Sequence, residues 1–364
     1  MGARGEGACG STWVTSCSWP RASEQLEPRR PEMRNAFDVS VIVSLHNRVR
    51  LVRHALDSLS AERHPSVRLQ LIVVDDGSTD GGGDAIARDY PWVSLIQQPQ
   101  LGAPAARNRG LSEAGGAACL FLDSDDLVDQ NFFEARLVAL EAHPEADGAY
   151  GPSEHFAGEG DFEEGLVIPR HTPYPVVEQL DDRSHLLRLL AGWYIAPHAV
   201  LWRTRALRRV SGQDETLAVN QDVDLMFRIL LSGHGIVGCR GTRALVRQHG
   251  GPRVGDLLSS RKKVAHAFQL RRRFADELSR EKELDRDARA ALARYCFDRW
   301  AELRYEFPEE AAGFLKLSRE LEPALHLRGR LPLRMLSRAI GPVRAQMLRH
   351  CINRWSHVGK TAHR

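Results

Sequence analysis

The chain has 364 residues, of which 43% are hydrophobic and 27% charged, a composition typical of a folded protein with one large domain and an appendage. Its formal net charge of +3 is too small to indicate nucleic acid as a partner, so any basic partner surface must be local. The six cysteines lie far apart without a CxxC pair, which argues against a zinc ribbon or a disulfide-rich scaffold and indicates a reducing compartment.

The N-terminal residues 1–36 are rich in Gly, Ser, Pro and Arg and show no periodicity, which predicts a disordered tail. They lack the apolar core of about 7–15 residues that a signal peptide needs. Nowhere in the chain do about 18 apolar residues follow one another, so we expect no transmembrane helix. Together these features indicate a cytoplasmic protein.

From Asp38 onward, short apolar runs alternate with stretches of helical periodicity. The expected strands lie in the segments DVSVIVSL, LQLIVVDD, VSLIQQ and CLFLDSDD. Each is followed by an expected helix: Val49–Leu59, Asp84–Tyr90, Ala103–Ala114 and Asn131–His143. Strands that are apolar on both faces and joined by helices predict an α/β fold with a parallel sheet covered on both sides. In such sheets, ligands bind beyond the carboxyl ends of the strands.

The second half of the chain is expected to be mainly helical. The segment Gly151–Gln179 is rich in Gly and Pro and has acidic patches, which predicts a mobile loop. The next expected elements are a helix, a strand and a helix, over Ser184–Ala191, Ala199–Arg203 and Asp222–Leu231. From Asp256 onward the pattern is helical, with breaks expected near Pro308, Pro323 and Pro332.

Two of the expected strands end in acidic clusters, Asp75-Asp76 and Asp123-Ser124-Asp125-Asp126. Both clusters should meet at the ligand-binding edge of the sheet. Neighbouring carboxylates raise each other's pKa unless a cation lies between them, and Mg²⁺ or Mn²⁺ with phosphate oxygens suits such a cluster. An isolated DxD is also common in capped turns and solvated loops, so this motif alone is weak evidence for a nucleoside diphosphate site.

Five segments in order, VSVIVSLHN, LIVVDDGSTD, GAPAARNRGL, CLFLDSDD and NQDVDLMFRIL, resemble the successive signatures of family 2 glycosyltransferases. The resemblance covers about Val39–Gly251. It implies a GT-A fold, a Rossmann-like and mostly parallel sheet flanked by helices, over residues 37–253, followed by a helical region over 254–364. It also implies an inverting transfer of a sugar from a nucleotide-sugar donor, with UDP-sugars as the first expectation, to an acceptor hydroxyl in surface polysaccharide or glycolipid assembly.

The same resemblance assigns the donor site. It implies Asp125 as the direct ligand of Mn²⁺ or Mg²⁺, whereas Asp126 could touch the donor sugar or cap the next helix. His249 matches a late family motif together with Arg247 and could join the metal shell or hold phosphate, although a surface-loop role is as good an interpretation. The residues implied for nucleotide-sugar binding are Ser44, His46, Asn47, Asp75, Asp76, Arg107, Asn108, Asp123, Ser124 and Asp126.

Asp222 matches the catalytic base of the family, which removes the proton of the acceptor hydroxyl. Asn220 can cap the following helix, which places Asp222 in the first turn, where the helix dipole favours the ionised carboxylate that a base needs. An acidic residue in a first turn is also common without any catalytic role. The family pattern has Glu-Asp where this chain has Gln221-Asp222, and Gln can form hydrogen bonds but cannot ionise.

The acceptor is expected to be a saccharide or a lipid-linked saccharide. Trp193 and Trp202 flank the expected acceptor region and could stack on a sugar, although core packing is the stronger expectation. Pro323–Arg364 contains nine Lys or Arg and no Asp or Glu, with apolar residues at helical spacing. That pattern suits an anionic membrane surface and would allow peripheral attachment to the inner face of the membrane. Alternatively, the segment could pack on an acidic surface of the protein or form a dimer contact.

Three other functions remain open. A catalytically silent nucleotide-sugar binding module would explain Gln221, but both Asp125 and Asp222 are retained. A sugar nucleotidyltransferase should have a Gly-rich phosphate loop after the first strand, where this chain has SLHNRVR. A dinucleotide-dependent oxidoreductase is the weakest alternative because no GxGxxG motif follows that strand.

Overall fold

A seven-stranded sheet forms the centre of the computed structural model, which describes residues 37–60, 64–158, 166–168, 182–248, 260–323 and 343. The strand order is β10-β6-β9-β4-β1-β2-β3, and β9 runs antiparallel to both of its neighbours while the other pairs are parallel. The strands are β1 (Val39–Leu45), β2 (Leu69–Asp76), β3 (Ser94–Gln98), β4 (Ala118–Asp123), β6 (Gly148–Tyr150), β9 (Val200–Arg203) and β10 (Ile236–Gly238).

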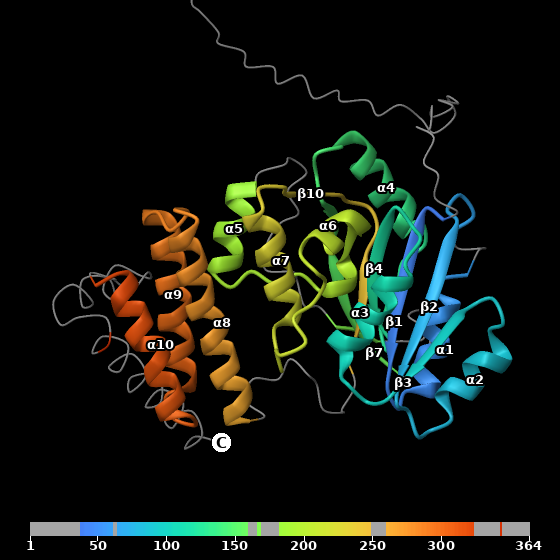
Figure 1. Cartoon of the computed structure of the whole chain (residues 1–364), viewed down its shortest axis with the longest axis horizontal. Helices are drawn as coiled ribbons and strands as arrows, with labels where there is room; N and C mark the ends of the chain where they lie inside the picture. Colours follow the sequence, from blue (N-terminus) through green and yellow to red (C-terminus); the bar gives the residue numbers. More distant parts are fainter. Residues whose placement is uncertain are drawn as a thin grey trace, which may run out of the picture. The chain divides into compact units, whose positions relative to one another are not determined.

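The apolar runs fold as central strands because both of their faces are covered. Val41, Ile42 and Val43 of β1 have no exposed surface, and burying side chains of this size stabilises the fold by about 1.5–3 kcal/mol each. Helices cover the sheet in the alternating pattern that the sequence predicts (Figure 1). They are α1 (Val49–Asp57), α2 (Gly82–Asp89), α3 (Ala103–Glu113) and α4 (Phe132–Ala142).

The register of the central strands brings their carboxyl ends to one edge. Leu45 of β1 pairs with Asp75 of β2, and Ser44 pairs with Asp123 of β4. Helix α3 packs very close to β1, because a Cβ atom at Gly110 would lie 2.4 Å from a methyl carbon of Ile42. This close approach holds the first half of α3 near the same edge of the sheet.

A second, four-stranded sheet lies beyond the acidic end of β4. Its order is β5-β11-β7-β8, with β5 (Leu127–Val128), β7 (Ser153–Ala157), β8 (Leu166–Ile168) and β11 (Ala244–Gln248). The expectation of a loop over Gly151–Gln179 is therefore wrong for the residues of β7 and β8, and much of the rest of that segment lies outside the described residues. Strand β7 pairs in parallel with β11, about ninety residues later, and local sequence patterns do not reveal such a distant partner.

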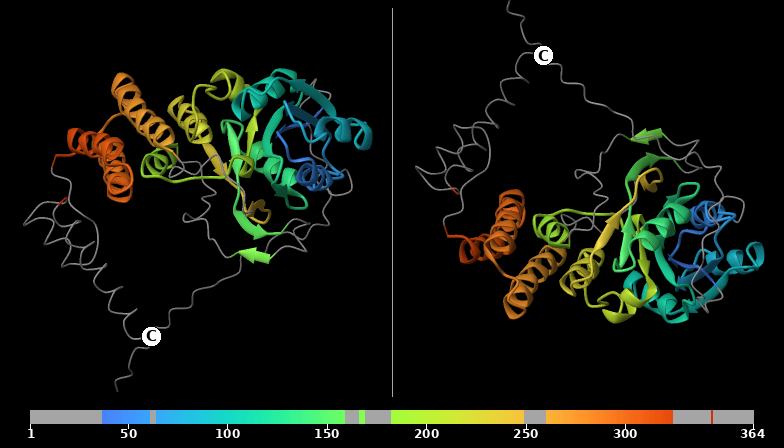
Figure 2. Two further views of the ribbon diagram at one scale, coloured as in Figure 1. Left: turned by 90° about the horizontal axis from the view of Figure 1, so that it is seen from below. Right: turned by 90° about the horizontal axis from the view of Figure 1, so that it is seen from above.

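The remaining helices include three long ones after residue 260. Two views of the ribbon show α8, α9 and α10 side by side, next to α5 and α7 (Figure 2), and contacts join α8 to α7 and α9 to α5. Aromatic side chains of these helices belong to the main hydrophobic core. Within it, Phe227 of α7 stacks on Phe274 of α8, with ring centroids 3.8 Å apart. The helices are α5 (Asp182–Leu190), α6 (Thr204–Arg209), α7 (Gln221–Leu231), α8 (Arg261–Arg280), α9 (Arg286–Leu303) and α10 (Pro308–Leu321), with a 3-10 turn over Pro197–Ala199.

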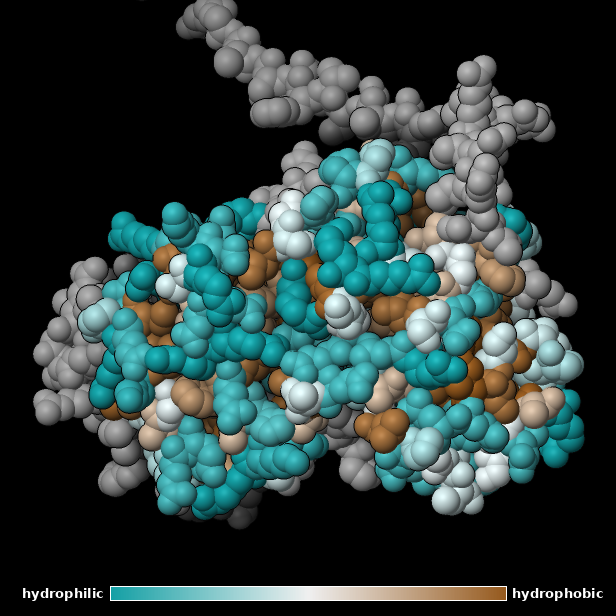
Figure 3. Space-filling model, in the orientation of Figure 1, coloured by the Kyte–Doolittle hydropathy of each residue, from teal (hydrophilic) through white to brown (hydrophobic). Residues whose placement is uncertain are grey.

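The outer surface of these long helices is charged. Figure 3 shows mostly hydrophilic residues on this face. Ion pairs also join α8 to α10, such as Arg261 with Glu309, 3.0 Å apart. Arg272 of α8 similarly pairs with Glu320 of α10. Among the helices that the structure describes, none has the length and hydropathy needed to cross a membrane.

Candidate active site

Hydrogen bonds of predicted donor-site residues link the loop that follows β1 to the loop that follows β2. The Nδ1 atom of His46 lies 2.9 Å from the carbonyl oxygen of Asp76 and donates a hydrogen bond to it. The backbone N–H of Asn47 donates to Ser78 Oγ at 3.1 Å, and its side-chain oxygen accepts from the N–H of Thr79 at 2.7 Å. The two loops therefore form one rigid wall at the carboxyl edge of the sheet.

The two carboxylates at the end of β2 are buried and tied to the backbone. Asp76 accepts hydrogen bonds of 2.8 Å from the N–H groups of Leu101 and Gly102, so it holds the entry to α3. Asp75 accepts from the N–H of Ser78 at 3.0 Å. A Cβ atom at Gly83 would lie 2.5 Å from Asp75 Oδ2, so a larger residue at that position would displace this carboxylate. Contact of either carboxylate with the base or ribose of a donor stays a prediction.

Three carboxylates gather where β4 ends. Asp123, Asp125 and Asp126 each offer an oxygen atom, and these atoms lie within 4.8 Å of one another. Oxygen ligands at this spacing suit a hard divalent cation such as Mg²⁺ or Mn²⁺. Two arginines face the cluster: Arg48 Nη1 lies 2.5 Å from Asp125 Oδ2, and Arg107 forms an ion pair with Asp123.

These contacts separate the pKa values of the acidic cluster. Burial would raise the pKa of Asp123, but Arg107, His198 and Arg48 outweigh it, so that pKa is lowered. Burial raises the pKa of Asp126 well above its ordinary value, and the neighbouring carboxylates Asp125 and Asp123 add to the increase. Asp126 therefore holds its proton far more strongly than Asp123 does.

Asp126 and its neighbours join the cluster to the second sheet. Asp126 accepts from the N–H of Arg247 at 2.8 Å, and Arg247 Nε donates to the carbonyl oxygen of Asp125 at the same distance. Helix α4 begins after Asn131, with β5 in between, so the alternative that Asp126 caps the next helix is wrong. His249 lies outside the described residues, so its predicted role in the metal shell stays a prediction.

The sequence pattern did not identify His198, which lies fully buried beside Asp126. Its Nδ1 is 3.3 Å from Asp126 Oδ2, and burial lowers its pKa to about 4, against the opposing effect of Asp123. The imidazole is therefore neutral at physiological pH. Buried histidines without a motif cannot be distinguished from other core histidines by sequence.

Asp222 occupies the first turn of α7, as predicted. Asn220 is the residue before the helix, but it adopts a left-handed conformation (φ +60°) and its side chain does not cap the helix. Burial raises the pKa of Asp222, although the N–H of Val223, the charge of Arg107 and a hydrogen bond from Tyr194 lower it. The expectation that the helix terminus favours the ionised form is thus incomplete, because desolvation is the larger effect.

Tyr194 is a second residue that the sequence pattern missed. Its hydroxyl forms a hydrogen bond with Asp222. Desolvation of this hydroxyl, followed by the charges of Asp222, Asp123 and Asp126, raises the pKa of Tyr194 well above the ordinary value, although 51% of the residue surface is exposed. The phenol hydroxyl is therefore near both the predicted base and the acidic cluster. Trp193, by contrast, is only 2% exposed and stacks on His185, so core packing is confirmed for it, as it is for the 3% exposed Trp202.

Arg107 and Asn108 of α3 hold the segment that leads to α7. Arg107 Nη1 donates to Gln213 Oε1 at 3.1 Å, and the amide of Asn108 forms two 2.8 Å bonds with the backbone of Gln213 and one with Glu215. The Gln221 side chain donates to the carbonyl oxygen of Leu217 at 3.0 Å, also within this segment. Arg107 and Asn108, which are predicted to bind the nucleotide-sugar donor, thus also help to position the base.

Ser44 and Ser124 complete the predicted set. Ser44 is half-buried at the end of β1, and Ser124 is buried between the carboxylates of the cluster. The described candidates therefore lie at the carboxyl ends of the central strands, in the loops that follow them, and in helices α3 and α7.

A mainly parallel sheet with C-terminal helices, and with carboxylates where β4 ends, defines an α/β fold of the GT-A type. S. aureus TarS 1–349 shares this fold. Its structure in complex with UDP-GlcNAc has a TM-score of 0.53 at 17% identity and covers 80% of this chain and 93% of that chain. The complex of the same protein with UDP gives a TM-score of 0.52 over the same shares of both chains.

Residues 40–182 match the family model described as glycosyl transferase family 2, the family that the sequence motifs resemble. Glycosyltransferase YibD of Escherichia coli is 35% identical over 113 residues, or 30% of this chain and 32% of YibD. AglE of Haloferax volcanii is 34% identical over 101 residues, or 26% and 33%.

A longer match extends the similarity beyond the family model. The pre-mycofactocin glycosyltransferase of Mycobacterium tuberculosis is 28% identical over 222 residues, covering 57% of this chain and 42% of that protein. The chain spans about a third of the length of YibD and AglE and less than half of the mycobacterial protein.

Proposed function

We propose that this protein is an inverting glycosyltransferase that moves a sugar from a nucleotide-sugar donor to an acceptor hydroxyl. One observation carries the proposal: Arg107 forms an ion pair with Asp123 of the acidic cluster and also donates to Gln213, in the segment that leads to Asp222. A basic group and a cluster suited to a metal-bound diphosphate are therefore parts of one site. A UDP-sugar is the first candidate donor, supported by the GT-A fold shared with TarS, whose structures contain UDP and UDP-GlcNAc.

In the proposed reaction, Asp222 accepts the proton of the acceptor hydroxyl while that oxygen attacks the anomeric carbon of the donor. The new glycosidic bond forms as the bond to the nucleoside diphosphate breaks, and the configuration at the anomeric carbon inverts. Burial raises the pKa of Asp222, which strengthens it as a base. Asn108 and Arg107 hold the segment before α7 and thereby help to position this base.

Asp125, with Asp123 and Asp126 beside it, fits a Mn²⁺ or Mg²⁺ ion because their oxygen atoms lie within 4.8 Å of one another. When bound, the cation would neutralise negative charge on the departing nucleoside diphosphate. Arg48 and Arg107 already offer positive charge at Asp125 and Asp123 and are suited to hold phosphate oxygens.

A catalytically silent binding module is the alternative with a specific observation in its favour, because Gln221 stands next to the base. The Gln221 side chain donates to the carbonyl oxygen of Leu217 and so has a structural task that needs no ionisation. This favours an active enzyme. Assembly of surface polysaccharide or glycolipid, on saccharide or lipid-linked acceptors, is the pathway that we propose for it.

Calorimetry with UDP, GDP and dTDP, with and without Mn²⁺, tests the donor site in the wild type, Asp125→Ala and Asp222→Asn. We expect one nucleotide to bind in a metal-dependent way, with binding lost in Asp125→Ala and retained in Asp222→Asn. With a matching sugar donor, transfer by Asp222→Asn should fall by about 10²–10⁴-fold. Absence of nucleotide binding by the wild type would overturn the proposal, and full transfer by Asp222→Asn would remove the assigned base.

A further inference from the structure

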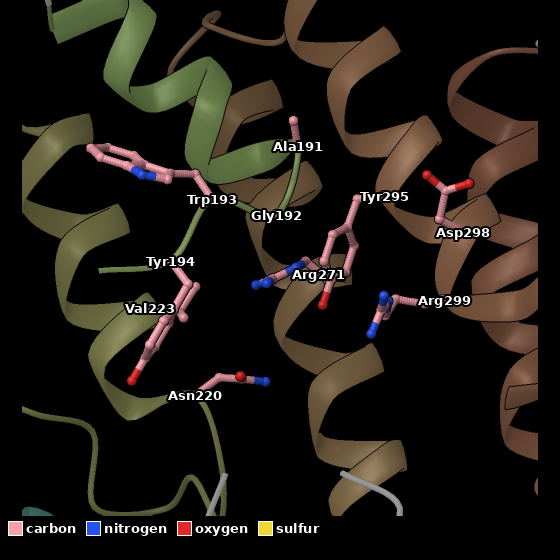
Figure 4. Close-up of a pocket in the computed structure, with 10 residues that line it drawn as sticks. All are labelled: Ala191, Gly192, Trp193, Tyr194, Asn220, Val223, Arg271, Tyr295, Asp298 and Arg299. Carbon is pink, nitrogen blue, oxygen red and sulfur yellow. The ribbon is translucent and has the colours of Figure 1, made fainter. Parts of the chain in front are cut away.

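A cavity of about 270 Å³ lies beside the predicted base, between the end of α5, the start of α7 and the long helices α8 and α9. In Figure 4 the side chains of Arg271, Arg299 and Asn220 point toward its centre, with Tyr194 on one side and Tyr295 on the other. The cavity is close to the lower limit of about 300 Å³ for drug-sized ligand pockets, so it suits a single sugar residue.

Arg271 of α8 is only 3% exposed, yet no carboxylate within the described part of the chain forms an ion pair with it. Its Nε and Nη1 are buried and find no hydrogen-bond acceptor there. Its guanidinium lies over the rings of Tyr295, at 4.3 Å, and Phe274, at 5.0 Å. Ring contacts replace only part of the hydration that a buried cation loses, so an anion beside Arg271 would be stabilising.

Other hydrogen-bond donors on the wall of the pocket also favour an anionic ligand. Asn220 Nδ2 and Arg299 Nε are buried and, within the described residues, also lack an acceptor. Arg299 uses another nitrogen to pair with Glu302 at 2.6 Å, and Asp298 on the wall pairs with Arg294 at 3.6 Å. The unsatisfied groups of this pocket are therefore donors, and a guanidinium binds carboxylate or phosphate with two parallel hydrogen bonds.

The pocket is also connected to the predicted chemistry. Tyr194 lines it and forms a hydrogen bond with Asp222. Gly192 lets this wall approach α9, because a Cβ atom there would lie 2.9 Å from the ring of Tyr295. A ligand in the pocket would thus be a neighbour of the base.

We infer that this pocket is the acceptor subsite, and that it selects an acceptor sugar bearing an acidic group, a carboxylate or a phosphate, which Arg271 binds. The inference rests on the proposed function, since it takes Asp222 as the base that the acceptor must reach. Arg271 is accordingly a specificity-determining residue, with Asn220 and Arg299 as further donors to the same group.

Binding of small sugars tests the inference. Glucose, glucuronic acid and glucose 6-phosphate are titrated into the full-length protein with Mn²⁺ and a saturating amount of the nucleotide that binds best, so that the donor site is filled. We expect at least one acidic sugar to bind roughly tenfold or more tightly than glucose, because charge-assisted hydrogen bonds are the strong ones. Which acidic sugar binds distinguishes a carboxylate from a phosphate acceptor.

The Arg271→Gln variant should lose this preference, and the matched control Arg272→Gln should keep it, because Arg272 is exposed and pairs with Glu320. A thermal melt should show no lower Tm for Arg271→Gln, since the buried charge has no carboxylate partner to lose. Equal binding of all three sugars to the wild type, or an unchanged preference in Arg271→Gln, would overturn the inference. Nucleotide binding in the same samples separates that outcome from failure of the donor site.

Discussion

The carboxylate of Asp222 is subject to two opposing effects in the first turn of α7. Burial raises its pKa, while the N–H of Val223, the charge of Arg107 and the hydroxyl of Tyr194 lower it. A base must lose its proton before it can accept another, so activity should decline as the pH falls through this raised pKa. The partners of Asp222 therefore determine the lower pH limit of the reaction.

Tyr194→Phe removes one of the groups that lower the pKa of Asp222. The pKa of the base should then rise further, and the acid limb of kcat/KM should move to higher pH. The transfer rate measured across the pH range checks this, with Tyr295→Phe as a control that also alters a pocket tyrosine. An acid limb that stays in place in Tyr194→Phe would show that the hydroxyl does not influence the base.

Motif residues and their tertiary partners differ in how well sequence identifies them. Asp125 and Asp222 are recognisable because their neighbours along the chain form an ordered pattern. Tyr194 and His198 are not, because they reach the site only through the folding of the segment between α5 and β9. Their environment, rather than their residue type, gives them a role.

The segment between α6 and α7 decides where the base lies, and α3 holds this segment. Asn108 bonds to the backbone of Gln213 through both ends of its amide. Gly212 leaves room for this contact, because a Cβ atom there would lie 2.3 Å from Asn108 Oδ1. The amide thus has a structural task besides the donor contact that the family resemblance implies.

Asn108→Ala should therefore destabilise the protein by about 1–3 kcal/mol, since the polar groups of the segment lose their partners. Urea unfolding measures this change, and the neighbouring variant Arg109→Ala should stay within about 0.5 kcal/mol, because that side chain forms only an exposed pair with Glu113. If Asn108→Ala weakens nucleotide binding while leaving stability intact, the amide serves the donor and not the segment.

The alternation of strands and helices up to α4 was predictable, because each element is set by local periodicity. Strand β7 and its partner β11 were missed, since short strands far apart in sequence are stabilised by each other. The break between α8 and α9 was also missed. It has no proline and depends instead on Lys282 in a left-handed conformation and on Asp285, whose side chain accepts from the N–H of Ala288 at 2.9 Å.

Charge is distributed unevenly along the molecule. The net charge is only +3, yet Pro323–Arg364 contains nine Lys or Arg and no acidic residue, so the rest of the chain is acidic overall. Nearly all of this basic segment lies outside the described residues, and its association with a membrane stays a prediction. Helix α10 ends at Leu321, so a variant that stops at Glu322 keeps every helix between α1 and α10.

Flotation with vesicles that contain anionic lipid should separate the full-length protein from the variant ending at Glu322. We expect the full-length chain to float with anionic vesicles, because each basic residue near such a surface contributes about 1 kcal/mol. Binding should weaken in high salt, which screens these charges, and neutral vesicles serve as the control. Equal flotation of the two proteins would exclude the basic segment as a membrane anchor and favour its packing against the acidic part of the chain.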